Sequence, residues 1–334
     1  MKTQTEPNAF TDQFWAMGCR IKMWLACDDA ALATDLFQKA ERLFHSYEQT
    51  FSRFLPDSEL SQVNGRSGEW VQLSARFWEM LVTALAVAEL TDGHYDPTLL
   101  AALEAAGYTH SFEAGVLAAT DSVMQTAVTH PQQWQAVQLD SPRRAVWLPP
   151  GMKLDLNGIV KGVTAARAAQ VLSEGGGCLI NAGGDLVAGD PPPNWPGWPV
   201  AIAAPRAAAL PQNLLQFWLA NACLMTSGKD NRQWPWQGGQ AHHLIDPQHG
   251  RPAENDLLTA TVLLANPAQT EAIATAVCVM GCQKGADWLA ARHIPALLAT
   301  TSGSVHTTPA MRQAYLHNRQ KEKLDDSTTR NKSA

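Results

Sequence analysis

The segment Leu154-Asp155-Leu156-Asn157-Gly158-Ile159-Val160-Lys161-Gly162 connects the end of a predicted strand to the start of a predicted helix. Gly158 permits a tight turn, and Lys161 lies close to the expected helix start at about Val160. Free backbone N–H groups and a cation at a helix N-terminus are suited to bind a phosphate. Strand–glycine–helix junctions are also common as plain connections, so this segment alone leaves a purely structural role open.

Strand and helix patterns surround this junction. Ile21, Met23 and Leu25 alternate in a predicted strand at Arg20–Cys27, and Leu32, Leu36 and Phe44 form one stripe of a helix expected over 28–45. Further strands are expected within 134–156 and at 178–180, 200–203 and 259–264, with helices at 74–90, 160–172 and from Asn266-Pro267 to Gly281. Strands and helices do not alternate strictly. The pattern therefore predicts a layered α/β (α+β) fold with mixed, largely antiparallel sheets and packed helices.

Length and charge limit the class of protein. The chain has 334 residues, 25 of them basic and 31 acidic, for a net charge of −6 without a basic cluster, so no nucleic-acid partner is expected. We expect a flexible arm at 1–11, a single domain at 12–311 and a polar tail at 312–334. No apolar stretch approaches the ~20 residues that span a bilayer, and no apolar leader begins the chain. We therefore expect no membrane span and a cytoplasmic location.

Two glycine-containing motifs could bind a ligand. Asn181-Ala182-Gly183-Gly184-Asp185 follows a short apolar strand, and its paired glycines would let the backbone approach a ligand closely. Met225-Thr226-Ser227-Gly228, with Arg232 four residues on, combines hydroxyls and a guanidinium that would suit a pyrophosphate. The first motif is equally compatible with a hairpin turn, and the second with an ordinary loop.

Two further motifs carry groups suited to acid–base and metal chemistry. His243 lies in His242-His243-Leu244-Ile245-Asp246-Pro247, and imidazole is the natural general base near neutral pH. Glu271 and Thr275 are spaced i and i+4 and share one helix face, where their oxygens would suit Mg²⁺. Each motif also has a plain explanation, because a lone strand histidine is often structural and a lone helical glutamate is often solvated.

The order of these motifs resembles the ApbE family of FAD:protein FMN transferases. The matching series comprises Met17-Gly18-Cys19, Phe51-Ser52-Arg53-Phe54, Asp57-Ser58-Glu59-Leu60, Asn64, Gly93-His94-Tyr95-Asp96-Pro97-Thr98, 155–162, 181–185, Thr226-Ser227-Gly228, 243–247 and 271–275. The resemblance covers roughly residues 12–310. It implies that Mg²⁺-bound FAD is attacked at its FMN phosphorus by a threonine or serine hydroxyl of an acceptor flavoprotein, such as a redox-complex or reductase subunit. AMP leaves, and FMN stays attached through a phosphoester bond.

The resemblance also implies roles for individual residues. His243 corresponds to the catalytic histidine, Lys161 assists electrostatically, and Asp246 corresponds to an acid beside the site. Glu271, Thr275 and the backbone carbonyl of Val160 would hold Mg²⁺, or Mn²⁺ in its place. The positions implied for FAD binding are Met17, Asn64, Asp96, Asp155, Lys161, Asn181, Gly183, Gly184, Asp185, Ser227 and Arg232.

This sequence departs from the family pattern at the implied metal site. Glu271 stands where the family usually has aspartate, which moves the carboxylate outward by about one methylene. Two alternatives to FMN transfer therefore stay open. One is a metal-dependent FAD pyrophosphatase that yields FMN and AMP, and the other is a flavin-binding module without catalysis.

Overall fold

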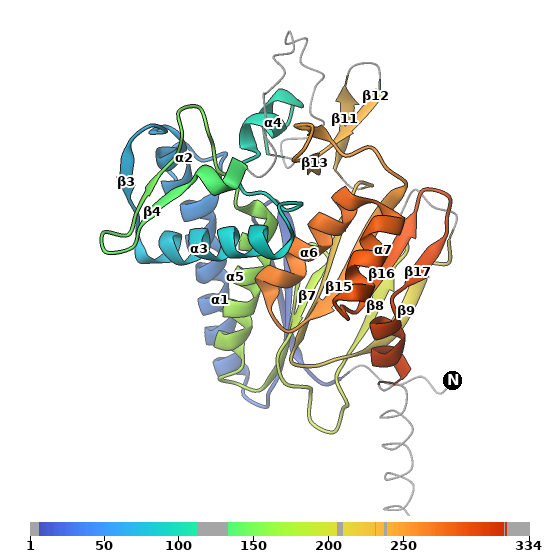
Figure 1. Ribbon diagram of the computed structural model, residues 1–334. Helices are drawn as coiled ribbons and strands as arrows, with labels where there is room; N and C mark the ends of the chain where they lie inside the picture. Colours follow the sequence, from blue (N-terminus) through green and yellow to red (C-terminus); the bar gives the residue numbers. More distant parts are fainter. Residues whose placement is uncertain are drawn as a thin grey trace, which may run out of the picture.

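A computed structural model describes residues 7–111, 133–205, 210–230, 232–236, 239–316 and 318, and its centre is one antiparallel sheet (Figure 1). The sheet has eight strands in the order β1-β2-β6-β7-β10-β15-β16-β17. Their bounds are β1 Phe10–Ala16, β2 Cys19–Ala26, β6 Gly177–Ala182, β7 Asp185–Ala188, β10 Ala222–Gly228, β15 Leu257–Leu264, β16 Ala296–Thr300 and β17 Val305–Thr307. Every neighbouring pair in this sheet is antiparallel. The predicted fold class is confirmed.

Helices cover one face of the sheet. Along that face lie α1 (Ala30–Phe51), α5 (Asn157–Leu172), α6 (Pro267–Met280) and α7 (Cys282–Ala291). Beside α1 and α5 lie α2 (Glu59–Asn64), α3 (Ala75–Leu90) and a small sheet in the order β3 (Trp70–Gln72), β5 (Ala145–Trp147), β4 (Gln138–Asp140), preceded by a 3₁₀ turn at Gln133–Ala136. Near the top of Figure 1 lie α4 (Leu100–Ala105), the hairpin β11 (Gln233–Trp236) and β12 (Gly239–His242), and the pair β13 (Ile245–Asp246) and β14 (Arg251–Pro252).

The opposite face of the sheet packs against the hairpin of β8 (Trp198–Ala203) and β9 (Asn213–Leu219) and a C-terminal helical segment at 309–316. Trp198 is fully buried between the two layers. Asn318 then exchanges two hydrogen bonds with the backbone of Trp218, accepting its N–H at 2.8 Å and donating to its carbonyl at 2.6 Å. The side-chain amide thereby occupies the free backbone groups of β9 at this position.

The core explains why these residues form these elements. In β2, Ile21, Met23 and Leu25 alternate with more exposed residues and are fully buried against the helices. Asp29 caps α1 by accepting hydrogen bonds from two backbone N–H groups of its first turn. The helix continues to Phe51, beyond the predicted end at His45, because Tyr47 and Phe51 extend its buried stripe.

Element boundaries mostly follow the predicted signals. Asn266 caps α6 by accepting from Gln269 N at 3.0 Å, and Gly281 ends it with a φ of +84°, as expected. The predicted helix at 160–172 instead begins at Asn157, so Val160 and Lys161 lie within its first two turns. Leu32 was expected on the buried stripe of α1 but is 38% exposed, because the buried face of these turns runs through Ala33, Leu36 and Phe37 instead.

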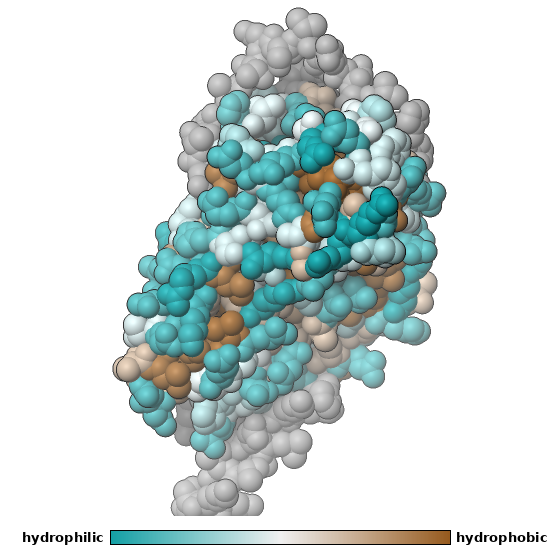
Figure 2. Space-filling view, turned by 90° about the vertical axis from the view of Figure 1, so that its left-hand side faces the viewer, coloured by the Kyte–Doolittle hydropathy of each residue, from teal (hydrophilic) through white to brown (hydrophobic). Residues whose placement is uncertain are grey.

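The terminal segments are described only in part. β1 starts at Phe10, within the expected arm, while residues 1–6 lie outside the described part of the chain. The helical segment 309–316 enters the expected polar tail, and 319–334 lie outside the description. The face seen in Figure 2 is largely polar, with apolar residues in separate patches. Within the described ranges, no helix is both long enough and apolar enough to cross a bilayer.

Replacing Phe44 tests the packing of α1. Its ring is fully buried and meets Phe14 edge-on at a centroid distance of 5.5 Å. Phe44→Ala should lower the free energy of unfolding by about 3–5 kcal/mol, because it leaves a cavity under the sheet. Leu32→Ala on the same helix is the control and should cost less than about 1 kcal/mol. Urea denaturation measures both; equal losses would contradict this account of the α1 interface.

Candidate functional site

An ammonium between two carboxylates lies where α5, α6 and the β6–β7 hairpin meet. Lys161 of α5 forms ion pairs with Asp185 and with Glu271, whose Oε1 is 3.0 Å from Lys161 Nζ. Glu271 Oε2 also accepts a hydrogen bond from Gly162 N at 2.9 Å. All three charged side chains are largely buried, at 17%, 8% and 7% exposure for lysine, aspartate and glutamate. Buried charges persist when they are paired in this way.

The glycine-containing hairpin delivers Asp185 to this cluster. Gly183 and Gly184 have φ values of +63° and +108°, which L-residues rarely adopt, and Asn181 Oδ1 accepts from Gly184 N at 2.8 Å. Asp185 Oδ1 accepts from Thr226 N at 2.9 Å, which joins the hairpin to β10. The motif is thus a hairpin turn, as one interpretation expected, and it also brings a carboxylate next to Lys161.

The residues expected to hold a metal lie around the same cluster. Thr275 follows Glu271 by one helical turn, and its Oγ1 is 3.0 Å from Ser227 Oγ of β10. The Val160 carbonyl lies one residue before Lys161 and accepts from Thr164 Oγ1 at 2.6 Å. In the described ranges, no three His, Cys, Asp or Glu side chains gather in a metal-binding arrangement. A carboxylate, a hydroxyl and a carbonyl are nevertheless the oxygen donors that suit Mg²⁺, which keeps waters and shares phosphate oxygens.

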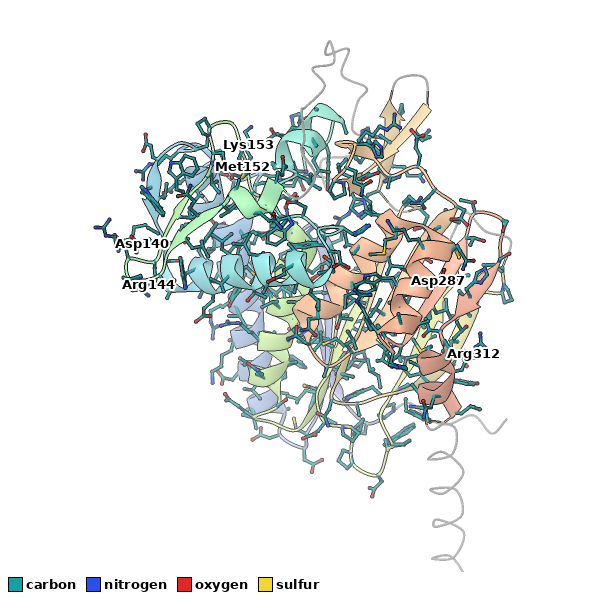
Figure 3. All side chains as sticks on the ribbon, in the orientation of Figure 1. Asp140, Arg144, Met152, Lys153, Asp287 and Arg312 are labelled. Atoms are coloured by element: carbon teal, nitrogen blue, oxygen red, sulfur yellow. The ribbon has the colours of Figure 1, made fainter. Side chains whose placement is uncertain are left out.

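The segment before α5 is held from several sides. Asn64 donates to the Leu154 carbonyl at 2.9 Å and accepts from Leu154 N at 2.7 Å, so its amide is used to hold this segment. Asp155 Oδ1 accepts from Asn157 N at 2.9 Å in the first turn of α5. Lys153, labelled in Figure 3, pairs with Glu104 of α4 at 2.7 Å. Asp140 and Arg144 lie at the outer end of the β4–β5 hairpin, away from α6.

Two predicted FAD-binding residues have mainly local partners. Asp96 Oδ1 accepts from the backbone N–H and the hydroxyl of Thr98 at 2.8 and 2.5 Å, while burial raises the pKa of Asp96. Met17 and Gly18 have φ values of +52° and +68° in the β1–β2 turn, and Met17 N donates to Glu48 Oε1 at 2.8 Å. These contacts fix the backbone at two of the predicted positions.

His243 follows β12, and its Nδ1 is buried. Burial lowers the pKa of His243 to about 3, and the positive charge of Arg232 adds to the shift. The ring is therefore neutral at physiological pH, which is the form that can accept a proton. Its neighbour His242 is also held neutral by burial, with a pKa of about 4.

Asp246 pairs with a different histidine. Its Oδ2 is 2.6 Å from His249 Nδ1, and its Oδ1 accepts from Gln248 N at 2.8 Å. These contacts close the turn between β13 and β14. Among the described contacts, Asp246 is therefore bound within its own turn and has no hydrogen bond to His243.

Two site residues escaped the sequence interpretation although both lie inside its motifs. The Arg53 guanidinium stacks 4.4 Å from the rings of Phe54 and Tyr108, and its Nε lies 3.4 Å from Asp155 Oδ2. Arg53 Nη2 and the hydroxyl of Tyr95 are buried without a hydrogen-bond partner among the described residues. Such unused donors fit a ligand rich in acceptor oxygens, as a phosphate ester is.

Shared electrostatic effects connect the histidine to the charged cluster. Burial raises the pKa of Tyr95 strongly, and the charges of Asp155 and Glu271 raise it further. Asp155 pairs with Arg53, whose own charge contributes to lowering the pKa of His243. Arg53, which pairs with Asp155, is thus the described link between His243 and the start of α5.

Comparisons with known proteins identify the family of this chain. The family model described as "ApbE family" matches residues 17–298, and the chain belongs to this family. The FAD:protein FMN transferase of Klebsiella pneumoniae (strain 342) is 29% identical over 298 residues, covering 86% of this chain and 88% of the relative. The enzyme of that name from Chlamydia trachomatis serovar D is 27% identical over 282 residues, covering 80% and 84% of the two chains.

Solved structures show the same fold. The crystal structure of the ApbE protein of Thermotoga maritima MSB8 superposes with a TM-score of 0.81 at 23% identity, covering 92% of this chain and 99% of that one. The apo form of the Pseudomonas stutzeri flavinyl transferase ApbE gives a TM-score of 0.77 at 21% identity, covering 94% and 99%.

The buried histidines predict a pH-dependent stability. The unfolded chain protonates histidine near pH 6.5, whereas the folded protein protonates His242 and His243 near pH 4 and pH 3. Between these values the unfolded state binds more protons, so the free energy of unfolding should fall as the pH falls from about 6.5 to about 4. Urea denaturation at a series of pH values should show a smaller fall for His243→Gln. The same slope in both proteins would contradict the low pKa of His243.

Proposed function

We propose that this chain transfers FMN from FAD to a threonine or serine hydroxyl of an acceptor flavoprotein and releases AMP. The observation that carries the proposal is the buried cluster of Lys161, Asp185 and Glu271, with the neutral imidazole of His243 as the proton acceptor. Membership in the ApbE family and the names of its curated relatives support the same reaction. The acceptor would be a subunit of a redox complex or a reductase, and the reaction would take place in the cytoplasm.

The chemistry begins with a weak nucleophile. The acceptor hydroxyl needs a base, and neutral His243 accepts its proton at a ring nitrogen. The hydroxyl oxygen forms a bond to the FMN phosphorus while the bond between that phosphorus and the bridging oxygen of AMP breaks. Both electrons of the broken bond leave with AMP. If water replaced the hydroxyl, the same steps would give free FMN.

The residues of the charged cluster would bind and orient the pyrophosphate. Lys161 supplies a positive charge close to the N-terminal end of α5, where Asp155 accepts from the Asn157 N–H. Arg53 and Arg232 bring further positive charge to the side of His243. Glu271, Thr275 and the carbonyl of Val160 would hold Mg²⁺ or Mn²⁺, which offsets phosphate charge when bound.

A transfer assay tests the reaction directly. The purified protein with FAD, Mg²⁺ and an acceptor flavoprotein should yield an acceptor heavier by one esterified FMN, together with AMP, as measured by intact mass spectrometry. His243→Ala should keep its affinity for FAD but transfer FMN about 10²–10⁴-fold more slowly, because general-base catalysis is lost. Free FMN and AMP without an adduct would indicate a pyrophosphatase, and unchanged bound FAD would indicate a binding module.

The assignment of the metal ligand has its own test. Glu271→Gln keeps the shape of the side chain but removes its charge, so it should weaken the apparent Mg²⁺ affinity at least roughly tenfold, which corresponds to about 1.4 kcal/mol. Titration with Mn²⁺ followed by electron paramagnetic resonance measures this affinity without turnover. Glu174→Gln, a change at a surface carboxylate outside the cluster, is the control and should leave the titration unchanged. A Glu271→Gln protein with the parental Mn²⁺ affinity would rule out this ligand.

A further inference from the structure

A buried lysine outside the charged cluster lies beside the histidine segment. Lys229 follows directly after β10 and is 5% exposed. Its Nζ donates to Asn255 Oδ1 at 2.7 Å, to the Asn255 carbonyl at 3.0 Å and, more weakly, to the Ala253 carbonyl at 3.5 Å. Burial lowers the pKa of Lys229, and the negative charge of Asp256 acts in the opposite direction. Three oxygens thus surround one ammonium in the interior.

Asn255, which carries the first of these oxygens, is bonded to the end of the helix that carries the expected metal ligands. Asn255 Nδ2 donates to the carbonyls of Cys278 and Val279, at 3.0 and 3.1 Å, in the last turn of α6. Asn255 Oδ1 also accepts from Leu257 N at 3.0 Å at the start of β15. The asparagine therefore joins Lys229 to the C-terminal end of α6 and to the central sheet.

Ala253, two residues earlier, holds both neighbours of His243. His242 Nε2 lies 3.0 Å from the Ala253 carbonyl, and Ala253 N donates to the Leu244 carbonyl at 2.9 Å. His242 Nδ1 accepts from Leu244 N at 3.3 Å, so the proton of this neutral ring is on Nε2. His242 and Leu244, on either side of His243, are thus both bonded to Ala253, whose carbonyl also accepts from Lys229.

We propose that Lys229 is a positioning residue for FMN transfer, whose ammonium fixes the turn at 253–255 between the His243 segment and α6. The proposal rests on the proposed function, because FMN transfer gives His243 its role as proton acceptor and α6 its role in metal binding. Lys229 does not touch the reacting atoms; it acts by setting the distance between the proton acceptor and the metal-binding helix. A displacement of about 1 Å between such groups is enough to slow a reaction about a hundredfold.

The test uses Lys229→Ala, which removes the ammonium and leaves the three oxygens facing a cavity. We expect kcat for FMN transfer to fall between about ten- and a hundredfold, while KM for FAD and the Mn²⁺ affinity stay within about twofold. Added propylammonium should restore much of the rate, because it supplies N–H donors to the same oxygens. Tetramethylammonium has the charge but no N–H donor and should restore nothing. Lys39→Ala, at an exposed lysine of α1, is the matched control and should behave as the parent.

The outcomes separate positioning from general stability. The proposal would be overturned if Lys229→Ala kept the parental kcat. It would also be overturned if kcat, FAD affinity and Mn²⁺ affinity all fell equally and added ammonium restored none of them. If Lys229→Ala does not fold, Lys229→Met keeps the packing of the side chain and decides by the same measurements. If the parent transfers no FMN, the proposed function fails on its own. In that case the ¹⁵N NMR signal of the His243 imidazole tests the positioning role. The signal should shift in Lys229→Ala and return when propylammonium is added; an unmoved signal would refute the positioning role.

Discussion

The site depends on one ammonium shared by two carboxylates. Lys161, Asp185 and Glu271 come from α5, from a hairpin of the central sheet and from α6, so the ion pairs fasten three separate parts of the chain at one point. Removing the ammonium would leave two carboxylates without a counter-charge in a mostly buried place, which is costly. The three groups together carry a formal charge of −1. This excess negative charge is consistent with a site that attracts a further cation when an anionic ligand is bound.

Close approach of α5 to its neighbours is the second constraint. A Cβ at Gly162 would lie 2.7 Å from Glu271 Oε2 and 2.6 Å from the Met225 methyl group, and a Cβ at Gly158 would lie 2.8 Å from the Tyr95 ring. The two glycines therefore let the helix carry its lysine up to α6 while its first turn packs against an aromatic ring. The longer side chain of Glu271 fits this geometry, because its second oxygen reaches the backbone N–H of Gly162.

Much of this could be predicted from the sequence, and the exceptions have physical causes. The predicted start and end of α6 are correct, because the capping residue Asn266 and the terminating Gly281 act through contacts within a few residues. The start of α5 was predicted too late, because Asn157 and Gly158 are poor helix formers that are held by Asp155 and Tyr95. The apolar stripe of α1 did not reveal that Leu32 lies outside the buried face, which runs through Ala33 and Leu36.

For the site as well, residues within the motifs could be predicted, but contacts between segments distant in sequence could not. The motifs indicated Lys161, Asp185 and Glu271 individually, and the fold brings them together. Asp246 was expected beside the catalytic histidine, yet its described contacts are with His249 and Gln248 in its own turn. Arg53, Tyr95 and Lys229 were not predicted as site residues, because their surroundings come from segments distant in sequence. An isolated lysine after a strand gives no signal that three oxygens will surround it.

The amide of Asn318 has a consequence for how the chain end can be altered. It occupies both backbone groups of Trp218 that β9 would otherwise offer to another strand. Unpaired strand edges are templates for intermolecular β-pairing. A chain cut before position 318, or fused there to a purification tag that displaces the amide, would expose this edge beside an apolar layer and favour self-association. Tags are therefore better attached at the other terminus.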